Sequence, residues 1–85
     1  ALQVGQVMER LAQNMQVLAI THLPQIAAKG RAHYKVFKQD DNERTRTHII
    51  TLKPEQRIVE IAQMLSGAQP GASALQHAQE LLHMN

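Results

Sequence analysis

The residues that most constrain the fold are QVLAITHLPQIA, at positions 16–27. Residues 16–21 form a short, nearly continuous apolar run, which is typical of a strand covered on both faces, usually in a parallel sheet. Pro24 suits the first turn of a helix, where its missing N–H costs nothing. The sequence therefore predicts a buried strand, then His22, then a short helix that ends at Gly30.

Helices and a β-hairpin are predicted on either side of this stretch. Apolar residues at helical spacing predict an amphipathic helix before the strand, through Val4, Val7, Met8, Leu11 and Met15. Residues 31–53 predict a β-hairpin, with the polar letters QDDNE as a loop of about five residues. Two helices are predicted in residues 54–85, the last one reaching Met84. The expected order is helix, strand, short helix, hairpin, helix and helix, in one unit of three parts: 1–30, 31–53 and 54–85.

Composition narrows the class of protein. Eighty-five residues form one small domain at most, or a piece of a larger one. The chain opens inside an amphipathic pattern, so we expect it to be an excised piece. Only one tyrosine and one phenylalanine are present, which predicts an aliphatic core. The absence of cysteine excludes disulfides and thiolate metal sites. No apolar run approaches the roughly 18–20 residues of a membrane span, so we expect a soluble intracellular protein.

His22 is the first candidate for chemistry. In open α/β sheets, ligands bind beyond the carboxyl ends of the strands, where His22 is expected. An imidazole there can donate a hydrogen bond to a phosphate oxygen or orient a water molecule. The competing interpretation is that His22 only bonds a backbone group at the strand-to-helix turn, and spacing alone favours it. The chain has no glycine-rich phosphate loop and no buried acidic pair, so a complete hydrolytic site is excluded.

The hairpin carries a second candidate site. We expect Lys35 to lie near Arg44 or Arg46 across the strands, which would form a small basic patch able to touch nucleic-acid phosphates. The alternative is a solvated hairpin whose charges protect its edges, and it is favoured because Asp40, Asp41 and Glu43 offset the positive charge.

The remaining histidines are weaker candidates. His33 and His48 are expected in opposite strands of the hairpin and could come close, but spacing implies no third ligand, so no metal site is predicted. His77 and His83 lie six residues apart on one helix and share a face poorly.

Four stretches resemble the C-terminal part of the RecN family of bacterial DNA repair proteins, which are ABC-type ATPases of the SMC-like group. They are ITHLPQIAA, TRTHIITL, RIVEIAQMLSG and ALQHAQELL, which lie between residues 20 and 82. The resemblance as a whole covers nearly the whole chain. The resemblance implies an α/β fold, as the C-terminal fragment of a P-loop ATPase head. It also implies that His22 is the switch-loop histidine, which contacts the γ-phosphate of ATP and helps to position the attacking water.

Further expectations follow from the same resemblance. The intact protein would use ATP and Mg²⁺, whereas this piece alone would bind neither and would be inactive. Its partners would be the rest of the head, a second head through homodimerisation, and DNA, with no membrane. It would act in double-strand break repair and recombination, in the cytoplasm and associated with the nucleoid. The alternative is a non-catalytic α+β module that binds DNA or a protein through Lys35, Arg44 and Arg46.

Overall fold

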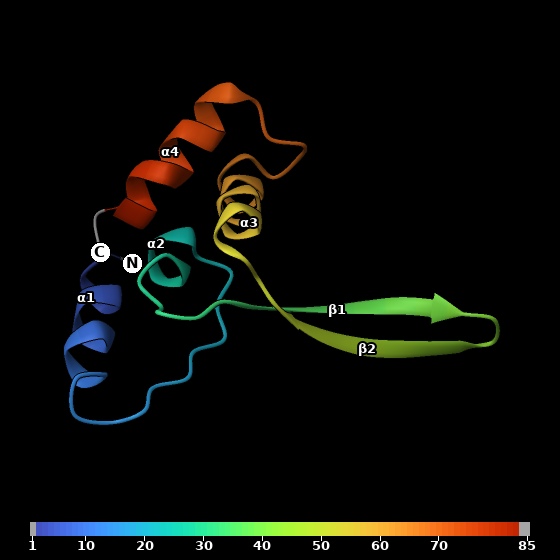
Figure 1. Cartoon of the computed structure of the whole chain (residues 1–85), viewed down its shortest axis with the longest axis horizontal. Helices are drawn as coiled ribbons and strands as arrows, with labels where there is room; N and C mark the ends of the chain where they lie inside the picture. Colours follow the sequence, from blue (N-terminus) through green and yellow to red (C-terminus); the bar gives the residue numbers. More distant parts are fainter. Residues whose placement is uncertain (1, 84–85) are drawn as a thin grey trace.

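The chain folds as a group of helices from which a long β-hairpin projects (Figure 1). The structure is a computed structural model that describes residues 2–83, so Met84, the expected last helical residue, lies outside the described part. The elements in chain order are α1 (Leu2–Leu11), α2 (Pro24–Ala27), β1 (Tyr34–Asp41), β2 (Arg44–Thr51), α3 (Pro54–Ser66) and α4 (Ala72–His83). The principal extents of the molecule, 44 × 34 × 20 Å, reflect the projecting hairpin.

The core lies where α3 and α4 pack together, beside the end of α2. Ile61, Ala62 and Ala78 have no exposed surface, and Ala28 is 1% exposed. Small alanine side chains let the helices approach closely, and leucines and Ile58 pack around the buried group. The core is therefore aliphatic, as the composition predicts. Gly67 ends α3 with a φ of 72°, a left-handed conformation that glycine adopts without steric cost.

The hairpin is longer and its loop shorter than the sequence predicts. Asp41 pairs with Arg44, so only Asn42 and Glu43 form the loop. The expected loop of about five residues is wrong, because residues 39–41 continue β1 and extend the ladder. Asn42 has a φ of 55°, and asparagine is one of the few residues whose short polar side chain makes this conformation tolerable.

The predicted strand over residues 16–21 is the main error. Within residues 2–83 the sheet contains only β1 and β2, and residues 16–21 form neither helix nor strand. Leu18 is 82% exposed and Ile20 is 100% exposed. A strand needs hydrogen-bonding neighbours and covered faces, and the described residues offer this segment neither. The segment runs around the outside of the helices between α1 and α2 (Figure 1).

The fold class is confirmed at a coarse level only. Helices are combined with a two-stranded antiparallel sheet, whereas the parallel sheet of a P-loop head is not seen in residues 2–83. In the same residues, no helix combines the length and the apolar character that crossing a membrane requires.

Candidate functional site

His22 lies in a turn whose backbone is fixed while its side chain is exposed. The hydroxyl Oγ1 of Thr21 accepts a hydrogen bond of 3.0 Å from the backbone N–H of Leu23, closing a turn around His22. Leu23 is extended (φ −99°, ψ 119°), as expected for a residue before proline. Within residues 2–83 no hydrogen bond joins the His22 side chain to a backbone group, and the residue is exposed to solvent.

The helix after His22 is too short to be stable by itself. α2 has one turn, begins at Pro24, and has no side-chain cap at its start. The carbonyl of Leu23 accepts bonds from the N–H groups of Ile26 (3.1 Å) and Ala27 (3.0 Å), and the carbonyl of Pro24 accepts one from Ala28 (2.9 Å). Because a single turn does not offset the cost of helix nucleation, α2 depends on contacts with α1 and α3.

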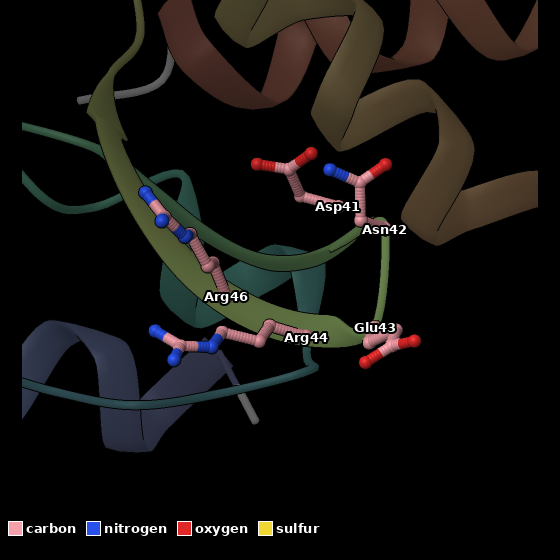
Figure 2. Close-up of a pocket in the computed structure, with 5 residues that line it drawn as sticks. All are labelled: Asp41, Asn42, Glu43, Arg44 and Arg46. Carbon is pink, nitrogen blue, oxygen red and sulfur yellow. The ribbon is translucent and has the colours of Figure 1, made fainter.

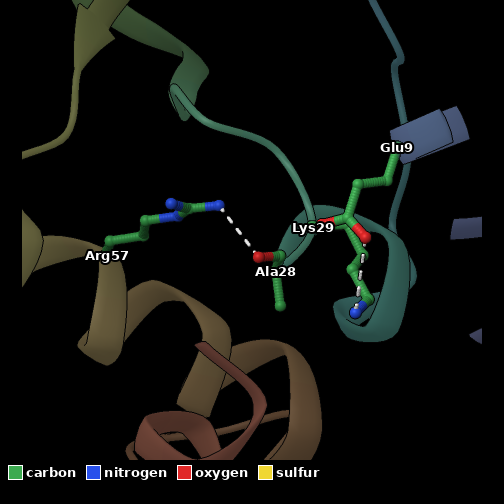
Figure 3. Close-up of polar contacts among 4 residues, drawn as sticks. All are labelled: Glu9, Ala28, Lys29 and Arg57. Atoms are coloured by element: carbon green, nitrogen blue, oxygen red, sulfur yellow. Dashed lines mark hydrogen bonds and ion pairs between the residues drawn. The ribbon is translucent and has the colours of Figure 1, made fainter. Parts of the chain in front are cut away.

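Arg57 of α3 supplies the contact on one side of α2. Its Nη2 atom is shared among three carbonyl oxygens, at 2.9 Å from Ala27, 3.3 Å from Ala28 and 2.5 Å from Gly30. Figure 3 shows the guanidinium reaching across the gap between the helices to Ala28. Burial lowers the pKa of Arg57 from its usual value. A cation at the carbonyl end of a helix also interacts favourably with the helix dipole.

α1 supports the other side of α2. A Cβ atom at Gly5 would lie 3.2 Å from both the carbonyl oxygen of Gln25 and Cγ of Lys29, so the two segments touch at a position that suits only glycine well. Lys29 Nζ lies 4.0 Å from Glu9 Oε1, an ion pair visible in Figure 3. The segment after His22 is thus held between α1 and α3 (Figure 1).

The structure does not assemble the basic patch of Lys35, Arg44 and Arg46, which the sequence analysis gives as the less favoured interpretation of the hairpin. Lys35 pairs with Ile50, whereas Arg46 pairs with Gln39. Lys35 and Arg46 therefore share a face but stand about 13 Å apart along the strands, at about 3.3 Å per residue. Lys35 Nζ instead forms an ion pair of 3.0 Å with Glu60 of α3. The prediction that Lys35 lies near the arginines is wrong, because the longer strands shift the register.

Arg44 and Arg46 do lie together, near the tip of the hairpin. Both are exposed and both occur on the same face of β2. Figure 2 shows their guanidinium groups on one side, with the Glu43 carboxylate pointing the opposite way from Arg44. The two arginines line a shallow hollow together with Asp41, Asn42 and Glu43. Nearby acidic groups thus reduce the positive potential of this tip.

His33 is a half-buried residue, which the sequence presents only as a weak candidate together with His48. It precedes β1, so it does not face His48, which instead stacks on Phe37 with ring centroids 5.3 Å apart. Within residues 2–83 the Nδ1 atom of His33 is buried without a hydrogen-bond partner, and so is the Nε atom of Arg57. Burial, and then the charge of Arg57, lower the pKa of His33, while Glu60 opposes the shift. His33 and Arg57 both line a hollow of about 410 Å³ at the base of the hairpin.

The described residues fit one contact to a nucleotide phosphate but no metal site. The exposed imidazole of His22 can donate an N–H to a phosphate oxygen. In residues 2–83 no group of three or more His, Cys, Asp or Glu side chains is placed to hold a metal ion.

Comparison with known proteins finds sequence similarity to DNA repair proteins. No protein-family model matches the chain. The DNA repair protein RecN of Deinococcus radiodurans is 49% identical over 82 residues, which is 96% of this chain and 14% of that protein. RecN of Vibrio cholerae is 43% identical over 93% of the chain, and RecN of Streptomyces coelicolor is 39% identical over 96%. The chain spans 14% of the length of each of these relatives. Over almost its whole length, this chain is a relative of the C-terminal region of the RecN family of DNA repair proteins.

Proposed function

We propose that this chain is the C-terminal part of an SMC-like ATPase head that acts in DNA double-strand break repair, and that His22 contacts the γ-phosphate of ATP. The observation that carries this proposal is the exposed imidazole on a turn whose backbone is fixed by Thr21 and by α2. The similarity to RecN proteins supports the role in DNA repair.

The proposed mechanism assigns His22 a positioning task. Its imidazole N–H donates to a phosphate oxygen, and this contact holds the transferred group in line with the attacking water. Phosphoryl transfer depends mainly on positioning and on stabilisation of charge, so one well-placed donor contributes strongly. ATP, when bound, supplies the transferable phosphoryl group. The phosphate loop, the Mg²⁺ ligands and the catalytic acid belong, in this proposal, to the remainder of a longer protein.

Exposed apolar side chains support this arrangement. The surface of α1 and of the segment after it carries large apolar groups that are 40–100% exposed, namely Leu2, Val4, Val7, Leu11, Met15, Leu18 and Ile20. Several large exposed apolar side chains on one element and the segment after it are typical of an interaction site. In this proposal the rest of the head covers these apolar side chains. A second head and DNA are the further proposed partners, in the cytoplasm.

Steady-state ATP turnover of the full-length RecN-type protein tests the proposal. His22→Ala should lower turnover by about 10²–10³-fold, the usual cost of removing one preorganised donor. The matched control is His77→Ala, which removes an exposed histidine of α4 and should leave turnover unchanged. Equal turnover in the two variants would exclude the role of His22.

A second candidate function is DNA binding through the tip of the hairpin. The observation in its favour is that Arg44 and Arg46 are exposed on one face of a projecting element (Figure 1). If they contact phosphates, DNA binding by the chain should weaken steeply with salt, and replacing both arginines by alanine should reduce the salt dependence. Lys53→Ala, at an exposed position away from the tip, is the control. Binding that the double substitution leaves unaltered excludes this surface.

A further inference from the structure

We propose that Arg57 is the positioning residue of the His22 turn: it holds α2 by its carbonyl end and thereby fixes the place of His22. The consequence for catalysis rests on the proposed function of His22. The consequence for the structure of the turn does not, and it can be measured separately.

The first step is the dependence of α2 on outside support. A helix of one turn leaves its last carbonyl groups without intrahelical partners. Arg57 donates to the carbonyl of Ala27, the last residue of α2, and to those of Ala28 and Gly30, which follow it. It does so from a helix that lies 27–30 residues further along the chain. These bonds tie the end of α2 to α3, which contributes Ile61 and Ala62 to the core.

The second step is the connection from Arg57 back to His22. Arg57 holds the carbonyl of Ala27, and the N–H of Ala27 donates to the carbonyl of Leu23. The N–H of Leu23 in turn donates to Oγ1 of Thr21. Hydrogen bonds therefore connect the guanidinium with both residues that flank His22. When Arg57 is lost, Leu23 and Thr21, at the other end of these bonds, are no longer held to α3 through α2.

The third step is the chemistry that the position requires. Arginine presents several N–H donors in a planar fork, which suits acceptors spread over consecutive residues, and it stays charged when partly buried. Lysine keeps the charge but concentrates its donors at one point. Methionine has similar bulk and neither donors nor charge. Arg57→Lys should therefore keep part of the effect, and Arg57→Met should abolish it.

Amide hydrogen exchange in the 85-residue chain tests the structural half. In Arg57→Met we expect the amides of Ala27 and Ala28 to exchange at least about tenfold faster, because hydrogen bonds to charged groups are among the stronger ones. Arg57→Lys should give an intermediate rate. Arg31→Met removes an exposed arginine and should change nothing. Unchanged α2 exchange in Arg57→Met, with the fold retained, overturns the inference.

A double-mutant cycle in the full-length protein tests the catalytic half. Arg57→Met should lower kcat for ATP hydrolysis by about tenfold or more with little change in KM, and it should add little when His22 is already alanine. Effects that multiply fully would overturn a role through His22. If His22→Ala alone has no effect, the proposed function fails, whereas the exchange rates still decide whether Arg57 holds α2.

Discussion

Nη2 of Arg57 lies 2.9 Å from the carbonyl oxygen of Ala27, although the two residues are 30 positions apart in the chain. This bond joins the segment that follows His22 to the helix pair that forms the core. A one-turn helix is thereby made part of the folded unit. The exposed histidine before it is presented from a supported turn rather than from a free loop.

The contact between α1 and α2 predicts the effect of filling Gly5. A leucine there would push against backbone atoms, because even a Cβ would lie 3.2 Å from the carbonyl oxygen of Gln25. We expect Gly5→Leu to lower the free energy of unfolding by about 1–3 kcal/mol, despite the better helix propensity of leucine. Gln6→Leu, at the neighbouring exposed position, should cost far less. Equal urea midpoints for the two variants would show that the helices do not approach closely here.

The loop of the hairpin predicts that position 42 accepts asparagine or glycine but not alanine. Its φ of 55° costs an alanine about 1–2 kcal/mol, whereas glycine adopts this conformation freely. Asn42→Ala should therefore weaken the hairpin and Asn42→Gly should not. Chemical shifts of β1 and β2 amides report the hairpin population directly. Glu43→Ala is the control, and a loss in that variant as large as in Asn42→Ala would contradict the assigned loop.

His33 predicts how stability depends on pH. Its pKa is lowered in the folded state, so below about 6.5 the unfolded chain takes up a proton that the folded chain resists. The stability present above this pH should fall as the pH is lowered through about 6.5 towards the folded pKa. His33→Gln should flatten that fall, and His77→Gln, at an exposed site, should not. Urea unfolding at a series of pH values checks this, and identical profiles would refute it.

The exposed segment after α1 predicts self-association of the isolated chain. Ile20 is fully exposed and Leu18 nearly so, and unpaired apolar segments of this kind pair with other chains. We expect Ile20→Lys to shift the chain towards monomer in sedimentation measurements over a range of concentrations. Asn14→Lys, in the exposed turn that follows α1, should have no such effect. A wild-type chain that is monomeric throughout would contradict this account.

The sequence correctly predicts the elements whose ends are set by single residues with a strong backbone preference. Pro24 and Pro54 open helices, Gly67 closes α3, and β-branched residues mark both strands of the hairpin. The sequence alone also points to His22. Each of these features is encoded by a residue whose backbone preference is strong, and neighbours along the chain are enough to express it.

The errors arise where structure depends on distant partners. Residues 16–21 carry a strand pattern, but a strand also needs neighbours, which the described residues do not provide. The position of Lys35 depends on the register, which the two-residue loop sets. Arg57 could not have been found, because its acceptors are backbone carbonyls with no sequence signature. The position of His33 could not be predicted for a similar reason, since its partial burial depends on its place at the base of the hairpin near Arg57.

The affinities of the full-length protein for ADP and for a non-hydrolysable ATP analogue test the central claim most directly. If His22 contacts the γ-phosphate, His22→Ala should weaken binding of the analogue by about tenfold or more, the value of a hydrogen bond to a charged group, and leave ADP binding unchanged. A variant that binds both nucleotides as tightly as the wild type does, or that loses both equally, would contradict the account.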